Sequence, residues 1–149
     1  MSGRLFPCRQ RATLLRMAIS SSRPAPAQSK EHELLAEAYR AFNARDIDAV
    51  LRLMHTDVDW PNGWEGGRVH GHEQVRDYWT RQWAALDPRV EPIAFTHRGN
   101  QILLDVHQVV RDHDGHLIAD HVVQHAYVLR DGLIERMDIV AFPSAEKTA

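Results

Sequence analysis

Cysteine is nearly absent: the 149 residues contain one, Cys8. A single thiol excludes an intrachain disulfide framework and any CxxC metal or redox motif, so a reducing, cytoplasmic setting is expected. Long apolar runs are missing as well. The longest, such as 102–104, are the length of a strand, far below the roughly 20 residues that cross a bilayer. The sequence therefore predicts no association with membranes.

Acidic residues are missing from the first 30 positions, which carry six basic side chains. A disordered basic leader is expected over 1–28, followed by one domain over 29–143 and a disordered tail over 144–149. Two interpretations of the leader stay open: an organelle transit peptide, or an upstream start codon with the true start near Met17. Residues 31–149 hold 12 basic and 20 acidic side chains. Such an acidic domain is poorly suited to nucleic acid, so no such partner is expected.

Motifs for covalent or nucleotide chemistry are also missing. The chain has no GxSxG nucleophile elbow and no phosphate-binding glycine loop with its lysine. Its ten histidines suggest a metal site, but His121 and His125 would stand about 13 Å apart on one strand, too far to share an ion. His70 and His72 lack a third ligand. We expect neither a metal nor a cofactor.

Apolar periodicity predicts an α+β domain. A helix beginning near Ser29 would carry Leu35, Ala38, Tyr39 and Phe42 on one face; Asp46 would cap a second helix, and a third would run from Gly71 to Leu86. Strands are expected over 57–62, 90–97, 100–111, 117–129 and 133–140. Asp-Gly pairs at 114–115 and 131–132 indicate antiparallel hairpins.

The hairpin geometry decides which side chains face the helices. A two-residue turn at Asp114-Gly115 would pair Gln108 with His121 and Leu104 with His125. A three-residue loop with a bulge at Gly132 would direct Leu133, Met137 and Ile139 to that same apolar face. The inward polar side chains would then be His125, Gln108, His121 and Tyr127. An inward histidine is either a hydrogen-bonded core residue or a ligand contact, because burial without a partner costs roughly 1–3 kcal/mol.

Four short strings occur in an order that resembles the nuclear transport factor 2-like superfamily, in particular its SnoaL-like (polyketide cyclase) and ketosteroid isomerase branches. The strings are AFNARDIDAV at 41–50, DVDW at 57–60, HGHEQV at 70–75 and RDGLI at 130–134. The resemblance covers about 30–142. It implies a cone-shaped roll, in which about three helices close one side of a curved antiparallel sheet around a ligand pocket. It also implies a homodimer formed through the outer sheet face, which carries Asp105, His107 and Val109.

Members of the superfamily include isomerases, cyclases, dehydratases, epoxide hydrolases and binding domains without activity. Alignment with ketosteroid isomerase puts Asn62 at the general-base aspartate, Ala38 (next to Tyr39) at the catalytic tyrosine, and His125 or Gln124 at the protonated aspartic acid. Because these substitutions remove the isomerase apparatus, steroid isomerisation is not expected. Histidine at 125 would still supply acid–base capacity near neutral pH, and Asn62 could donate a hydrogen bond to an oxyanion.

The sequence thus predicts a pocket for a small apolar organic molecule. Its expected catalytic residues are His125 and Asn62, and its expected substrate-binding residues are Trp60, Tyr39, Trp79, Gln108, His121, Tyr127 and Met137. One hypothesis is a cofactor-independent isomerase, cyclase or dehydratase acting on a carbonyl compound. The alternative is a ligand-binding or accessory dimerisation module of the same fold that catalyses nothing.

Overall fold

The computed structural model describes residues 26–140. The chain divides into two compact units, residues 1–31 and residues 32–149, and the whole sheet belongs to the second. The helices are α2 (Pro26–Asn43), α3 (Ile47–Arg52) and α4 (Gly71–Ala85). The strands are β1 (Met54–Pro61), β2 (Arg68–His70), β3 (Asp87–Arg98), β4 (Gln101–Arg111), β5 (Leu117–Arg130) and β6 (Leu133–Val140). Among the described residues, no helix is long and apolar enough to cross a bilayer.

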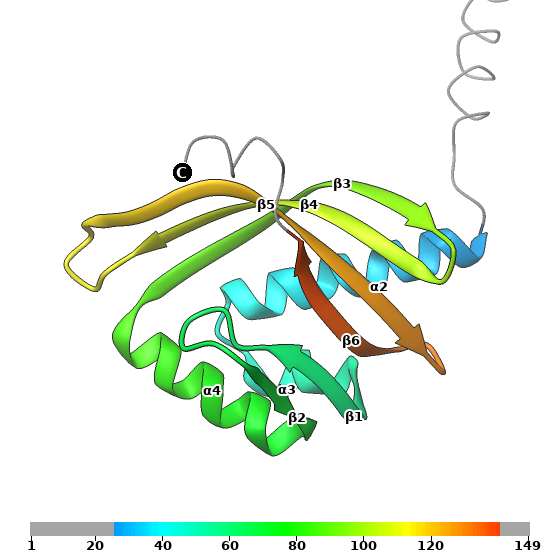
Figure 1. Ribbon diagram of the computed structural model, residues 1–149, viewed down its shortest axis with the longest axis horizontal. Helices are drawn as coiled ribbons and strands as arrows, with labels where there is room; N and C mark the ends of the chain where they lie inside the picture. The colour runs from blue at the N-terminus through cyan, green and yellow to red at the C-terminus, as the bar shows by residue number, and fades with distance from the viewer. Residues whose placement is uncertain (1–25, 141–149) are drawn as a thin grey trace, which may run out of the picture. The chain divides into compact units, whose positions relative to one another are not determined.

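The six strands form one curved sheet in the order β2-β1-β6-β5-β4-β3, with the helices on its concave side (Figure 1). The predicted α+β architecture is therefore confirmed. The expected all-antiparallel pairing is wrong at one place, because β1 lies parallel to β6. These two strands are far apart in the sequence, so no tight hairpin forces them to run in opposite directions.

The helices follow the apolar stripes of the sequence. Leu35 and Tyr39 of α2 are buried, as are Val75 and Trp79 of α4. Asp46 caps α3 as expected, since its carboxylate accepts a hydrogen bond from the backbone N–H of Ala49 at 3.1 Å.

Three predicted boundaries need correction. Helix α2 begins at Pro26 rather than Ser29, and proline suits a first helical turn because it has no N–H to leave unpaired. Residues 26–28 are thus helical, whereas the predictions for the rest of the leader and for 144–149 lie outside the described residues. Strand β1 begins at Met54, three residues before the expected start at residue 57. Strand β3 begins at Asp87, and its Pro88 is tolerated because β3 is an edge strand.

The β4–β5 hairpin has the predicted register but not the predicted turn. Gln108 pairs with His121 and Leu104 with His125, as expected. The turn, however, is three residues long, since the N–H of Asp112 bonds to the carbonyl of His116 at 3.0 Å. A bulge between the 110–119 and 111–117 pairs absorbs the extra residue. The inward face is unchanged as a result.

In the β5–β6 hairpin the predicted turn is too long, whereas in the β4–β5 hairpin it was too short. Its turn is the two-residue Asp131-Gly132, with φ values of 55° and 75°, and the expected three-residue loop is wrong. The bulge lies inside β6 instead, between the pairs of Val128 and Leu129. Met137 therefore still lies on the inward face, as the partner of Tyr127, but Ile134, fully buried, takes the inward position that was expected for Leu133.

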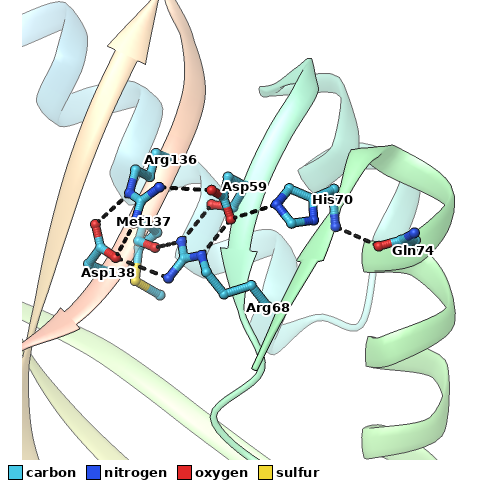
Figure 2. A network of polar contacts seen from close by, with 7 residues as sticks. All are labelled: Asp59, Arg68, His70, Gln74, Arg136, Met137 and Asp138. Atoms are coloured by element: carbon cyan, nitrogen blue, oxygen red, sulfur yellow. Dashed lines mark hydrogen bonds and ion pairs between the residues drawn. The ribbon is translucent and has the colours of Figure 1, made fainter. Parts of the chain in front are cut away.

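Strands β2, β1 and β6 are joined by a network of charged side chains on the face of the sheet opposite the core (Figure 2). Arg68 donates to Asp59 at 2.5 Å, to Asp138 at 3.0 Å and to the backbone carbonyl of Met137 at 2.6 Å. Arg136 bonds to the same two carboxylates. Arg68 thus ties β2 to both strands of the parallel pair.

We expect Arg68→Met to lower the free energy of unfolding by about 1–3 kcal/mol, because it leaves a carbonyl and two partly buried carboxylates with fewer donors. Urea denaturation measures this loss. The control is Arg130→Met, whose ion pair with Glu135 is half exposed and should be worth less than about 1 kcal/mol. Equal losses in the two variants would contradict a bracing role for Arg68.

Candidate functional site

A cavity of about 380 Å³ lies between the concave face of the sheet and the helices. Its volume falls within the range of sites for small organic molecules. Most of its wall is aliphatic or aromatic, and none of the described aspartate, glutamate, lysine or arginine residues lines it. The lining residues are Ala38, Tyr39, Phe42, Val50, Met54, Trp60, Pro61, Gly63, Trp64, Tyr78, Trp79, Gln82, Leu86, Pro88, Val90, Gln108, Val110, Ala119, His121, Val123, His125, Tyr127, Ile134, Met137 and Ile139.

His125 is the buried polar group of this wall, with 7% of its surface exposed. It lies on the same face of β5 as Tyr127, because residues two apart on a strand point the same way. Tyr39 comes from the apolar stripe of α2. Its hydroxyl lies 2.7 Å from Nδ1 of His125, and the hydroxyl of Tyr127 donates to it at 2.8 Å. A chain of hydrogen bonds therefore runs from Tyr127 through Tyr39 to His125.

Burial sets the protonation of all three groups. Desolvation lowers the pKa of His125 to about 4, so its imidazole is neutral at pH 7. Burial also raises the pKa of the Tyr39 and Tyr127 hydroxyls, and both stay protonated. His125, Tyr39 and Tyr127 are thus all uncharged at pH 7.

The hydrogen-bond chain assigns the histidine tautomer. Tyr39 accepts the proton of Tyr127, so it gives its own proton to Nδ1 of His125, and the imidazole proton is on Nε2. The reverse order would leave the buried hydroxyl proton of Tyr127 without an acceptor. Among the described residues Nε2 has no protein partner. The cavity therefore offers one N–H donor on an uncharged ring.

Aromatic rings form the wall beside His125. Trp60 of β1 packs edge to face against Trp79 of α4, with ring centroids 5.5 Å apart, and lies 6.2 Å from Tyr127. Tyr78, one residue before Trp79, is also buried and lines the cavity. Such walls favour flat, apolar molecules.

Asn62 is not part of the cavity wall. Its side-chain oxygen accepts the backbone N–H groups of Trp64 and Glu65, and its amide donates to the Glu65 carboxylate at 3.0 Å. These bonds fold the 62–67 loop. The structure therefore does not bring Asn62 together with His125, because an asparagine at the head of a glycine-rich loop satisfies the local backbone first.

Every other residue predicted for the site lines the cavity. Tyr39, Trp79, Tyr127 and Met137 are buried; Trp60 and Gln108 are half-buried, and His121 is exposed. Their roles toward a ligand remain predictions. Sequence reasoning did not assign Tyr78, Gln82 or Trp64 to the site. The first two share the apolar face of α4 with Trp79, a spacing that could have indicated them.

His70 and His72, which were considered as metal ligands, have separate partners. His70 lies 3.4 Å from Asp59, and His72 bonds to the backbone carbonyl of Met54 at 2.9 Å. Across residues 26–140, one cluster has the spacing of a metal site, formed by Asp112, Asp114 and His116 at the tip of the β4–β5 hairpin. Its Asp112 carboxylate already accepts the backbone N–H groups of the other two residues.

A family model described as a SnoaL-like domain matches residues 35–137. No curated protein matches the chain. Among solved structures, TerC co-crystallised with polyporic acid has a TM-score of 0.67 at 26% identity, covering 80% of this chain and 96% of TerC. An NTF2-like protein of unknown function from Burkholderia pseudomallei has a TM-score of 0.67 at 21% identity, covering 80% and 95%.

A third solved structure is the epoxide hydrolase/cyclase-like enzyme SalBIII, connected with pyran ring formation in the polyether salinomycin. It has a TM-score of 0.65 at 17% identity, covering 78% of this chain and 94% of SalBIII. At such low identities the likeness to SalBIII and to the Burkholderia protein concerns the fold. These comparisons confirm the predicted nuclear transport factor 2-like, SnoaL-like resemblance.

The lowered pKa of His125 predicts a pH-dependent stability. In the unfolded chain the imidazole of His125 takes up a proton below about pH 6.5, whereas in the folded state it stays unprotonated until about pH 4. The free energy of unfolding should therefore fall as the pH decreases through this window, and His125 should account for about 2 kcal/mol of the loss by pH 5. Urea denaturation at pH 7.5 and pH 5 measures it.

His125→Gln should lack this part of the pH dependence, while the exposed control His116→Gln should retain it. Both variants keep the other histidines, so their contributions cancel in the comparison. The same loss between pH 7.5 and pH 5 in wild type and His125→Gln would contradict the buried, neutral state of this imidazole.

Proposed function

Since the chain belongs to the SnoaL-like domain family, whose fold is that of small-molecule-binding proteins, we propose that its cavity binds a flat, largely apolar carbonyl compound and that His125 acts on it without a cofactor. The observation that supports this proposal is the unpaired Nε2–H of a neutral imidazole inside an apolar cavity. A ligand oxygen is the complement of such a donor.

The chemistry of His125 follows from its protonation state. A neutral imidazole that donates from Nε2 can polarise a carbonyl and stabilise the enolate oxyanion that develops when a base removes a proton from the neighbouring carbon. Tyr39 holds Nδ1 as an acceptor, so it is a positioning residue that keeps the Nε2 proton directed to the ligand. The reactions that use this stabilisation include cyclisation, isomerisation and dehydration through an enolate.

A specific observation favours the second candidate, a binding module without activity. Proton abstraction from carbon needs a base, and within residues 26–140 no carboxylate lines the cavity. His125 is a weak base in this setting, since its pKa is lowered to about 4. Chemistry here would be restricted to substrates whose reaction is limited by oxyanion stabilisation.

TerC, which is 26% identical to this chain, was co-crystallised with polyporic acid, so this compound is the first probe for the cavity. A ligand at 100 times its Kd stabilises the folded state by about 2.7 kcal/mol, which thermal unfolding detects as a rise of several degrees in Tm. Related flat quinones and diketones extend the screen. Any compound that raises Tm is then incubated with the protein and tested for conversion.

For a converted compound, His125→Phe should lower kcat by about 10²–10³-fold, the loss typical of one oxyanion donor. The variant should also lower Tm, because the buried Tyr39 hydroxyl loses its acceptor, so kcat is measured well below the Tm of the variant. His107→Gln, on the outer face of the sheet, is the matched control and should be unchanged. If bound compounds are never converted by the wild type, the binding module is the correct function. If none of them binds, the proposal is wrong.

We also propose that two copies pair through the outer sheet face, as the family resemblance implies. Ile118 and Val122 of β5 are 55% and 41% exposed, unusually high for large apolar side chains of a sheet. On the same face, His107 bonds to Asp120 at 2.7 Å, so its polar groups are already satisfied within the chain. Apolar residues between satisfied polar pairs suit a contact between copies.

Sedimentation equilibrium tests this pairing. The wild type should sediment at twice the chain mass at micromolar concentration, and Val122→Glu should shift it toward the monomer, because two like charges would face each other across the axis. Arg98→Glu, at the exposed end of β3, is a charge-change control. A monomeric wild type would contradict the pairing.

A further inference from the structure

We propose that Gln108 and His121 form a second polar subsite at the outer end of the cavity. It binds an oxygen at the far end of an elongated ligand whose other oxygen reaches His125. This inference rests on the proposed small-molecule function, and it narrows the ligand class to molecules with two separated oxygen acceptors.

Register puts the two side chains side by side. Gln108 of β4 and His121 of β5 are direct cross-strand partners on the concave face, and both line the cavity. Gln108 is half-buried and His121 is exposed, so the pair lies where the cavity meets solvent. Directly opposed residues have Cβ atoms about 5 Å apart, close enough for both side chains to contact one ligand atom.

Neither side chain is used by the protein. Among the described residues, the amide of Gln108 and the ring of His121 have no hydrogen-bond partner. The hydroxyls of Tyr39 and Tyr127 bond to each other and to His125, and that of Tyr78 accepts from Gln82 at 3.4 Å. Gln82 thus uses one of its amide N–H groups, whereas Gln108 and His121 lie side by side with their hydrogen-bonding atoms unused among the described residues.

Strand geometry separates these places. His121 and His125 are four residues apart on β5, a distance of about 13 Å along the strand. Hydrogen bonds of about 3 Å at each end leave roughly 7–13 Å between the two ligand oxygens. Val123 lies between the histidines and lines the cavity, so the middle of the ligand would meet an apolar surface.

The chemistry at the two ends differs. The inner end offers one N–H from an imidazole that burial keeps neutral, and it suits a carbonyl or phenol oxygen. The outer end offers an amide N–H and an imidazole in contact with water, and it accepts a hydroxyl, a carbonyl or a carboxylate. A compact single-ring compound would reach one end only.

Two rigid probes of matched shape test the subsite: 4-phenylphenol, with one oxygen, and 4,4′-dihydroxybiphenyl, with an oxygen at each end. Isothermal titration of the full chain should show about tenfold tighter binding of the second probe by the wild type. Gln108→Leu and His121→Leu should each reduce this ratio, and together they should bring it close to one without weakening the binding of 4-phenylphenol.

His107→Leu, on the opposite face of β4, should keep the tenfold ratio. Equal affinity of the wild type for the two probes would overturn the subsite and leave the pocket in place. A parallel loss of both affinities in the Gln108 and His121 variants would overturn it too, because their effect would then be on the fold. If neither probe binds, the pocket proposal fails and the subsite fails with it.

Discussion

The hydrogen-bond chain from Tyr127 through Tyr39 to His125 is the interaction on which the rest of the site depends. It satisfies three buried polar groups at once, and each of them would cost about 1–3 kcal/mol if left alone in this apolar layer. It also joins the sheet to α2 across the cavity. Because Tyr39 donates to Nδ1 of His125, the imidazole proton is on Nε2, and the buried histidine is a hydrogen-bond donor. Burial keeps these groups uncharged, and the hydrogen-bond chain determines which imidazole nitrogen carries the proton.

Much of the fold could be predicted because the faces of the strands follow the apolar pattern. Leu104, Val106 and Ile102 are buried as that pattern required. The turns could not be predicted in the same way, since an Asp-Gly pair fits both a two-residue turn and a longer loop. In each hairpin a bulge absorbed the difference in loop length. Burying the apolar face stabilises the fold more than the geometry of any one turn does, so the strands keep the register that buries this face.

The candidate site could likewise be predicted only in part. His125 and Tyr127 were accessible to prediction because their orientation depends on strand alternation alone. The bond between Tyr39 and His125 was not, since it depends on how a helix lies against the sheet. Asn62 shows the limit of transfer from a related enzyme: alignment put it at a catalytic position, but its side chain organises its own loop. Local backbone groups compete for an asparagine more effectively than a distant site does.

The pairing of β1 with β6 has a consequence for the shape of the cavity. No hairpin fixes the alignment of these strands, and sliding one past the other by a single residue would turn Trp60 to solvent and Asp59 into the apolar interior. The ion pairs that reach β6, from Asp59 to Arg136 and from Arg68 to Asp138, form in one alignment only. The charges on the exterior of the sheet thus discriminate between alternative alignments, and the dimensions of the cavity are specified partly by residues that do not line it.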